Sequence, residues 1–218
     1  MSGRTFALPP RHPLPPGVSL PQDSAQAYQD SETGAFLFWS QAESRLVIPP
    51  FPIDRFKETS GWHIGPMHSL LDRPRRIAVV LVRLGGFAIG VFEGERLIAS
   101  KVDSPFVKGR HRAGGSSSGR FARRREGQAR SLFDKACETF RDVVEPHRTS
   151  LDHLVLGGDR MTLVDFEKRC GYLSSFRAIR LRRILHVPDP RQKVLENAIQ
   201  VAYMSQVITF TPARPSPA

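Results

Sequence analysis

The segment from residue 77 to residue 102 reads IAVVLVRLGGFAIGVFEGERLIASKV. It contains three runs of apolar and β-branched residues, Ile77–Leu84, Phe87–Phe92 and Arg96–Val102, and short glycine-containing turns separate them. Runs of this kind with such turns between them are typical of strands that pair with their neighbours in the chain. The segment therefore predicts an antiparallel β-meander.

The chain after the meander alternates between helical and extended patterns. Apolar residues recur at three- and four-residue spacing from Phe121 to Val144, which predicts a long amphipathic helix that begins near Ser117 or Ser118 and ends at Pro146. The elements predicted beyond it are a strand over Leu151–Leu156, a helix over Met161–Arg169, a strand over Phe176–Val187 with one basic face, and a helix after Pro190. The predicted order is βββ-α-β-α-β-α, an α/β fold with a mixed β-sheet flanked by helices.

The first 34 residues contain six prolines and a polar stretch. This composition favours a flexible arm, so we expect residues 1–34 to stay outside the fold. In the part that follows, residues 36–39 and 46–48 are predicted to form short strands and Ile53–Thr59 a helix. We expect a single α/β domain over residues 35–211 and a loose tail over residues 212–218.

The composition excludes several classes of protein. Hydrophobic residues make up 40% of the 218 residues, which is enough for a folded core, and no stretch is long and apolar enough to span a bilayer. The N-terminus lacks the charged-then-apolar order of a signal peptide, so we expect a cytoplasmic protein. Cys137 and Cys170 lie far apart in the sequence and in no metal-ligand spacing. We therefore expect neither a disulfide framework nor a zinc site and interpret both as small buried apolar residues.

The formal net charge of +11 comes from two segments of the chain. Residues 108–130 hold eight basic residues and one acid, residues 177–193 hold six basic residues and one acid, and the rest is nearly neutral. Twelve of these fourteen basic residues are arginine, whose planar guanidinium matches phosphate and stacks on bases. Such segments favour nucleic-acid binding over an ordinary solvated surface.

A glycine- and serine-rich loop lies in the first basic segment, where residues 108–120 read KGRHRAGGSSSGR. A nucleotide-binding P-loop would need a lysine where this chain has Gly115. A catalytic serine would need a base on a rigid element, but His111 lies within the loop. A metal nuclease would need several carboxylates on the strands, yet Arg83 is the one charged residue of the first run. We expect no metal and no cofactor, and a plain surface linker is the remaining alternative.

Residues 114–123, which read GGSSSGRFAR, resemble the Gly-Gly-Gln loop and the Arg-Phe-Ala-Arg helix start in the middle domain of eukaryotic and archaeal class I peptide release factors. Within that superfamily the chain is similar to the actinobacterial branch of the Vms-like release-factor group, peptidyl-tRNA hydrolases proposed to act in ribosome rescue. The resemblance covers roughly Arg75 to Gln206. It implies an RNase H-like mixed sheet without the acidic metal site, and Ser116 stands where the family has glutamine.

The resemblance implies a peptidyl-tRNA hydrolase that acts in ribosome rescue, with Gly114, Gly115 and Ser116 as the catalytic residues. Its implied partners are the large ribosomal subunit and peptidyl-tRNA, and we expect a monomer that binds no membrane. The alternatives are a non-catalytic ribosome- or RNA-binding factor with the same fold, which Ser116 favours, and a tRNA endonuclease. The expected RNA-binding residues are Lys108, Arg110, His111, Arg112, Arg120, Arg123, Arg124, Arg180, Arg182 and Arg183.

Overall fold

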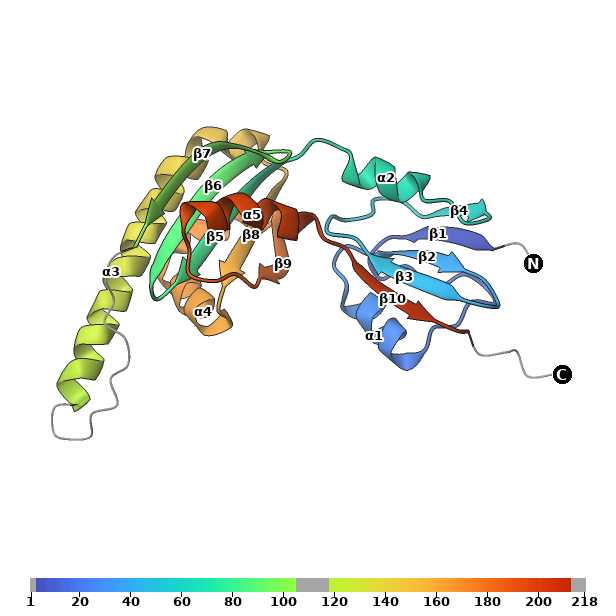
Figure 1. Cartoon of the computed structure of the whole chain (residues 1–218), viewed down its shortest axis with the longest axis horizontal. Coiled ribbons are helices and arrows are strands. Elements are labelled where there is room, and N and C mark those ends of the chain that lie inside the picture. Colours follow the sequence, from blue (N-terminus) through green and yellow to red (C-terminus); the bar gives the residue numbers. More distant parts are fainter. Residues whose placement is uncertain (1–2, 105–117, 213–218) are drawn as a thin grey trace. The chain divides into compact units, whose positions relative to one another are not determined.

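The computed structural model describes residues 3–104 and 118–212 of the chain, which divides into two compact units (Figure 1). One unit comprises Pro74–Ala202, and the other combines Met1–Arg73 with Tyr203–Ala218. Pro74–Ala202 is therefore inserted into the unit that the two ends of the chain form, and we call it the inserted unit. This differs from the prediction of one domain over residues 35–211 behind a flexible arm over residues 1–34, because the N-terminal segment has a core of its own.

The inserted unit is built on a five-stranded mixed sheet in the order β7-β6-β5-β8-β9. Its meander strands pair antiparallel, whereas β8 and β9 run parallel to β5. The meander and the βββ-α-β-α-β-α order predicted from the sequence are confirmed, and this strand order is that of an RNase H-like sheet. The strands are β5 (Arg76–Arg83), β6 (Gly86–Glu93), β7 (Arg96–Asp103), β8 (His153–Gly158) and β9 (Arg180–Leu185).

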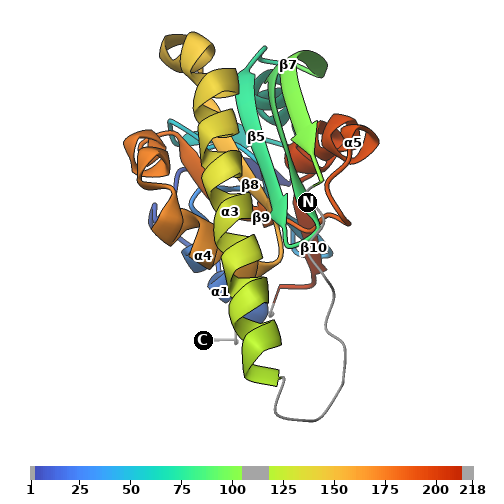
Figure 2. The same ribbon diagram turned by 90° about the vertical axis from the view of Figure 1, so that its left-hand side faces the viewer.

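One face of this sheet packs against two helices, α3 (Ser118–Val144) and α4 (Arg160–Arg169), as Figure 2 shows for α3. Leu132, Ala136 and Phe140 follow one another at four-residue spacing on α3 and lie in the same buried cluster as the alternate residues of β5 and β6. Short 3-10 turns follow these helices, η1 (Glu145–Ser150) after α3 and η2 (Gly171–Phe176) after α4.

The other face lies close to α5 (Gln192–Tyr203), and Gly90 on β6 permits that approach. A Cβ at Gly90 would lie 3.0 Å from the Leu195 side chain of α5 and 2.8 Å from that of Leu97. A larger residue at this position would force the Leu97 and Leu195 side chains to shift.

The two cysteines form a disulfide, Cys137–Cys170, with their Cα atoms 5.4 Å apart. The prediction that both would be separate apolar residues without a disulfide is therefore wrong. The cysteines are 33 residues apart in the sequence, but one lies on α3 and the other directly follows α4, and these helices pack side by side. Only the packing of the helices brings the two sulfur atoms together.

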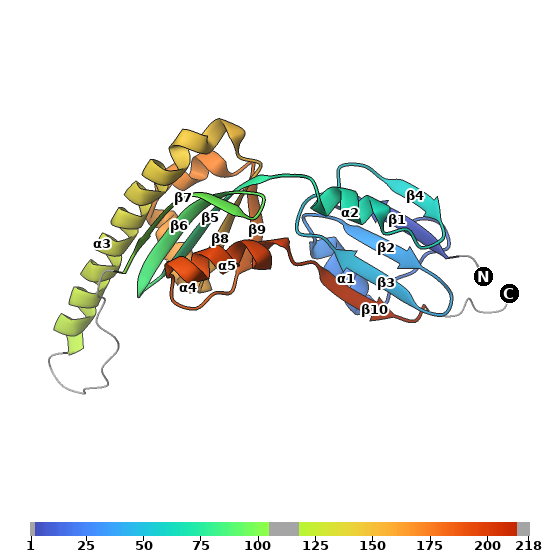
Figure 3. The same ribbon diagram turned by 45° about the horizontal axis from the view of Figure 1, so that its top comes forward.

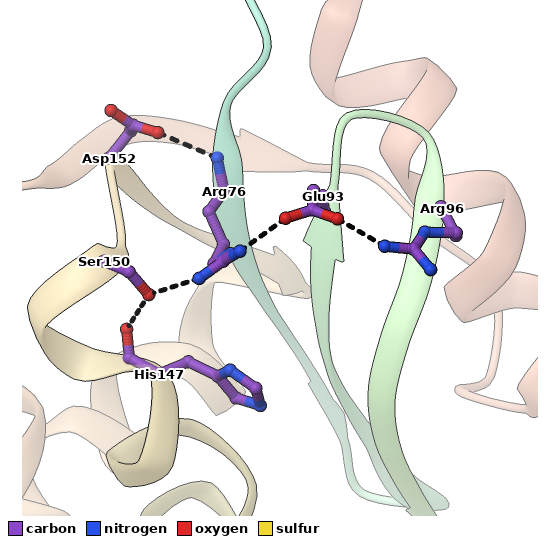
Figure 4. A network of polar contacts seen from close by, with 6 residues as sticks. All are labelled: Arg76, Glu93, Arg96, His147, Ser150 and Asp152. Atoms are coloured by element: carbon purple, nitrogen blue, oxygen red, sulfur yellow. Dashed lines mark hydrogen bonds and ion pairs between the residues drawn. The ribbon is translucent and has the colours of Figure 1, made fainter.

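A polar network joins the start of β5 to η1 and to the β6–β7 turn (Figure 4). The Arg76 guanidinium donates to Ser150 Oγ at 2.7 Å and to Glu93, and the backbone N–H of Arg76 donates to Asp152 Oδ2 at 2.8 Å. Glu93 also accepts a hydrogen bond from Arg96. The network attaches the chain that follows α3 to the start of the central strand β5.

The stabilisation from Glu93 is expected to disappear in acid. The hydrogen bond from Arg76, followed by that from Arg96, lowers the pKa of the Glu93 carboxyl. A carboxyl with a lower pKa in the folded state stabilises fully above its unfolded pKa and loses this effect as pH falls through its folded pKa. At about pH 7 the wild type should unfold at a higher midpoint urea concentration than Glu93→Gln. Near about pH 3 the two midpoint concentrations should be equal. A difference that stays constant with pH would contradict this assignment.

The other unit contains a second five-stranded sheet, antiparallel throughout, in the order β10-β3-β2-β1-β4 (Figure 3). Helix α1 (Gln22–Asp30) contributes Tyr28 to the core on one face, and α2 (Gly65–Leu71) contributes Met67 and Leu70 to the other. The strands are β1 (Arg4–Leu8), β2 (Ala35–Trp39), β3 (Ser44–Ile48), β4 (Lys57–Ser60) and β10 (Gln206–Phe210).

The first 34 residues are not a flexible arm. Strand β1 pairs with strands on both sides, and Phe6 and Leu8 are fully buried. The Tyr28 hydroxyl lies 2.9 Å from the Pro9 carbonyl oxygen and 2.8 Å from that of His12, which fixes the proline-rich segment on α1. The apolar residues before and between the prolines bury enough surface to order this segment. The prediction of a flexible arm is based on the number of prolines and does not take these apolar residues into account.

Two further expectations concern this unit. The helix predicted over Ile53–Thr59 is wrong, because the chain turns there and β4 follows in extended conformation beside β1. The strands predicted at residues 36–39 and 46–48 are confirmed as β2 and β3. Residues 213–218 of the predicted tail lie outside the described residues.

Candidate nucleic-acid interface

Helix α3 extends well beyond the sheet on which it packs (Figures 1 and 2). Its 27 residues span about 40 Å at 1.5 Å per residue. Leu132 is the first residue of α3 in the buried cluster, and Ala129 is partly buried against it. The first eleven residues of the helix, 118–128, therefore project past the core.

This projecting part of α3 is strongly basic at its N-terminal end. Arg120, Arg123, Arg124 and Arg125 lie within its first two turns, and the first acid is Glu126. The N-terminus of a helix carries a partial positive charge, so acidic residues are the stabilising choice there. Four arginines at this end raise the positive potential further. The arrangement is stabilised when an anion such as phosphate binds.

The predicted RNA-binding residues of α3 are partly described by the structure. It places Arg120, Arg123 and Arg124 on the helix, and the Arg123 side chain is exposed. About two turns after Arg123, Arg130 pairs with Glu126 across 3.6 Å, and both side chains are more than half exposed. Such an exposed pair contributes little to stability, so Arg130 can exchange Glu126 for another anion at small cost.

The predicted catalytic residues Gly114, Gly115 and Ser116 lie outside the described residues. The same holds for four predicted RNA-binding residues, Lys108, Arg110, His111 and Arg112. What the structure describes is where this segment is attached: strand β7 ends at Asp103, and α3 begins at Ser118.

An ion pair holds the strand end of this segment against α3. Asp103, the last residue of β7, pairs through Oδ2 with Lys135 Nζ. Lys135 lies seventeen residues after Ser118, so the helix start is about 25 Å further along the helix axis. The segment with the predicted catalytic residues therefore connects the sheet edge to the tip of the projecting helix.

The second basic segment forms β9, an edge strand that pairs with β8 alone. Leu154 pairs with Arg180 and Leu156 with Ile184, so the single residue between the two positions on β8 opposes three residues, 181–183, on β9. This bulge leaves both Arg182 and Arg183 exposed, although they are consecutive. The basic residues therefore do not all lie on one face of the strand, which corrects that prediction.

The Arg180 guanidinium donates two hydrogen bonds to the Glu167 carboxylate of α4, at 2.8 and 2.5 Å. A bidentate pair of this kind neutralises the charge and fixes the side chain. We therefore assign Arg180 to the attachment of β9 to α4. The side chains of Arg182 and Arg183 are exposed, and we still expect RNA contacts from them.

The last residues of β7 and β9 lie at the same end of the sheet. Strand β7 is antiparallel to β6, which is antiparallel to β5, so β7, β5, β8 and β9 all run in one direction. The end of β7 at Asp103 and the end of β9 at Leu185 are consequently at the carboxyl end of the sheet. They lie at opposite edges, about 19 Å apart at about 4.8 Å per strand.

Sequence reasoning missed the contacts that hold α3 in place. Arg169 at the end of α4 donates two hydrogen bonds to Asp134 on α3, at 2.6 and 2.8 Å, and thereby lowers the pKa of the Asp134 carboxyl. No motif marks this pair or the pair between Lys135 and Asp103. The residues of each pair are distant in the sequence, and only the packing of α3 reveals them.

The described residues hold neither of two other kinds of feature. Within residues 3–104 and 118–212, no three histidine, cysteine or carboxylate side chains gather as metal ligands would. In the same part of the chain, no helix is both long and apolar enough to cross a membrane.

Comparison with known proteins gives archaeal relatives. The chain is 26% identical to peptide chain release factor subunit 1 of Archaeoglobus fulgidus over 125 residues, which are 56% of this chain and 31% of that protein. It is 29% identical to the protein of the same name from Methanopyrus kandleri over 125 residues, 56% of this chain and 30% of the relative. The chain thus matches about a third of the length of these relatives.

Among solved structures, the chain is similar to the crystal structure of the archaeal translation termination factor aRF1, with a TM-score of 0.47 and 17% identity. That match covers 92% of this chain and 64% of the other. The family model of the actinobacteria/chloroflexi VLRF1 release factor matches residues 75–207, which comprise nearly all of the inserted unit. The resemblance inferred from residues 114–123 is confirmed, and the chain belongs to the actinobacteria/chloroflexi VLRF1 release factor family.

Proposed function

We propose that this protein is a peptidyl-tRNA hydrolase that acts in ribosome rescue, with the large ribosomal subunit and peptidyl-tRNA as its partners. The observation that carries the proposal is the basic tip of α3, which projects from the core and which follows Gly114 and Gly115 closely in the sequence. A projecting basic tip can enter a narrow RNA-lined space while the folded unit stays outside it. Membership of a release factor family supports the same function.

The reaction is hydrolysis of the ester between the nascent peptide and the terminal ribose of the tRNA. A water oxygen adds to the ester carbonyl carbon, and the carbonyl oxygen becomes an oxyanion. The carbonyl then re-forms as the C–O bond to the ribose breaks, and a proton from the added water is transferred to the ribose oxygen. The backbone N–H of Ser116 is assigned to the oxyanion. Gly114 and Gly115, without side chains, allow the backbone to approach the RNA closely.

The arginines supply binding energy and orientation in this mechanism. Arg120, Arg123 and Arg124 on α3 are assigned to phosphates near the reacting ester, and Arg182 and Arg183 to a more distant stretch of RNA. Phosphate contacts position a protein without reading the sequence, so recognition depends on RNA shape. Holding water, ester and N–H donor together with little freedom is the main source of rate acceleration.

A second candidate function is a non-catalytic ribosome- or RNA-binding factor, and the observation that favours it is Ser116. In the resembling release factors a glutamine stands at this position, and its side chain helps to place the water. Serine is shorter by two carbon atoms and lacks the amide group. The backbone N–H is common to both residues, so the two candidate functions differ in whether the side chain is required.

A Ser116→Gln variant distinguishes the two candidates. Wild-type protein and variant would be mixed with large subunits that carry labelled peptidyl-tRNA, and released peptide would be counted over time. The hydrolase function predicts release by the wild type, with a change of about tenfold or less in the variant, because the N–H donor is unchanged. An inactive wild type together with an active variant would overturn the proposal in favour of the binding factor.

A further inference from the structure

Three contacts join α3 to α4 along the seam between them. They lie within two turns of α3, between four and eight residues after Ala129, where the helix meets the core. One is a ring contact with centroids 6.1 Å apart, one is a bidentate ion pair, and one is covalent. In order along α3 they are Phe133 with Phe166, Asp134 with Arg169, and Cys137 with Cys170.

Towards the projecting tip, the seam between these helices opens into a cleft. Its volume is about 310 Å³, and both helices line it, α3 through Glu126, Ala129 and Arg130, and α4 through Asp165 and Lys168. The direction in which the tip points is therefore set by the contacts after Ala129. Where α3 faces α4, the contacts after Ala129 are the ring contact, the ion pair and the disulfide described above.

The disulfide is the strongest of the three restraints. The Asp134 and Arg169 side chains are 46% and 48% exposed, and an exposed ion pair restrains a helix only weakly. The contact between Phe133 and Phe166 lies in the buried core and is apolar, so it has no covalent or charged component. The bond between Cys137 and Cys170 alone fixes the distance between one point on α3 and one point at the end of α4.

A small change at this point is amplified at the tip. Ser118 lies nineteen residues before Cys137, about 28 Å along the helix, so a tilt of about 5° moves the tip by about 2.5 Å. A displacement of this size is enough to disturb a reacting geometry, because catalysis depends on placement within about 1 Å.

We propose that the Cys137–Cys170 disulfide is a redox switch that sets the position of the α3 tip and thereby the rate of peptide release. The inference rests on the proposed function and adds its regulation. Ribosomes work in a compartment where disulfides are rare and those that form are typically redox-sensing. The oxidised protein holds its tip in the active position, and reduction by a cellular thiol releases it.

Cys137 is the sulfur that a thiol can reach, because its residue is partly exposed, whereas Cys170 is fully buried. A thiolate attacks Sγ of Cys137, the bond between the two cysteines breaks, and Cys170 leaves as a thiolate that takes up a proton. A second thiolate then attacks the sulfur of the first thiol in the mixed disulfide, and Cys137 leaves as a thiolate that is protonated in turn. Two small thiols become one small disulfide, and the protein gains two electrons and two protons.

The first test compares release by oxidised and reduced protein on large subunits that carry labelled peptidyl-tRNA. Alkylation and mass measurement count the free thiols, and circular dichroism checks that both forms are folded. We expect reduction with dithiothreitol to lower kcat roughly fivefold or more, with little change in KM, and reoxidation to restore it. The inference would be overturned by equal kcat values for the oxidised form, in which no thiol is alkylated, and the reduced form, in which two thiols are alkylated.

Two variants separate the switch from a general loss of stability. The double variant Cys137→Ala, Cys170→Ala should release peptide at the reduced rate with or without dithiothreitol. The Asp134→Ala variant removes the neighbouring ion pair but keeps the disulfide, so its release should still depend on dithiothreitol. A double variant that matches the oxidised wild type would contradict the inference.

A distance measurement tests the switch without peptide release. Spin labels attached through ketone-bearing residues at positions 123 and 168 leave the cysteines intact, and both Arg123 and Lys168 are exposed. We expect reduction to shift or broaden their distance distribution by about 2 Å, whereas a control pair at Glu138 and Lys168, close to the disulfide, changes much less. Unchanged distances would overturn the switch. If neither redox form releases peptide, the proposed function fails, and this measurement still decides whether the tip moves.

Discussion

Replacement of Gly114 and Gly115 by alanine is expected to abolish peptide release. Two methyl groups at this point would prevent the backbone from approaching the RNA and from adopting positive φ, and the Ser116 N–H would then miss the oxyanion. Loss of one such donor costs about a hundredfold to a thousandfold in rate. Labelled peptidyl-tRNA on large subunits measures the effect directly, and co-sedimentation with these subunits should change little.

A matched control uses a glycine within α3. Among the described residues, no atom beyond the neighbouring backbone of its own helix lies within 4 Å of where a Cβ would stand on Gly127, and alanine is the better helix former. A Gly127→Ala variant should therefore release peptide at the wild-type rate and be more stable by about 0.5–1 kcal/mol. Release by the Gly114→Ala, Gly115→Ala variant at the rate of this control would refute the assigned mechanism.

Reversal of charge at the α3 tip should greatly weaken binding to ribosomal particles. A triple change of Arg120, Arg123 and Arg124 to glutamate removes the three arginines that we assign to phosphates and adds repulsion. We expect binding to weaken by roughly a hundredfold or more. The plot of log association constant against log salt concentration should become less steep, by about 2–3 in slope. Co-sedimentation at a series of salt concentrations measures both quantities.

The control for this experiment changes the same number of charges elsewhere. Arg11, Arg55 and Lys57 are exposed and lie in the unit that combines the two ends of the chain, outside both basic segments. Their joint replacement by glutamate alters the net charge equally but should leave the salt slope nearly unchanged. If both triple variants bind alike, net charge alone drives the association and the α3 tip has no special part in it.

The inserted unit could be predicted from sequence because its signals are local. The apolar runs at Ile77–Leu84 and Phe87–Phe92 and the turn between them specify a hairpin without reference to any distant residue. The helical spacing that ends near Val144 is equally local. Helix α3 covers the face that these strands leave apolar, so local pattern and global fold agree.

The other unit could not be predicted because its pairings are non-local. Strand β10 pairs with β3 across more than 150 residues, as in Val207 with Val47, and no pattern within either strand specifies the partner. Residues Arg4–Leu8 form an interior strand, but the prolines that follow dominate the local composition. Contacts of high sequence separation are where single-sequence reasoning fails.

The candidate site divides in the same way. The sequence patterns placed Arg123 on a helix and Arg182 on a strand, and both side chains are exposed. It could not separate Arg180, which is paired with Glu167, because that contact depends on how α4 packs beside β9. The disulfide between Cys137 and Cys170 was missed because two cysteines without a spacing motif carry no local signal.

Product analysis of one reaction tests the central claim most directly. Wild-type protein would be incubated with large subunits that carry peptidyl-tRNA labelled in both the peptide and the tRNA 3′ end. Hydrolysis of the ester predicts free peptide together with tRNA whose 3′ end is intact. Peptide that stays attached to tRNA, or that leaves on a tRNA fragment, would contradict the proposed function.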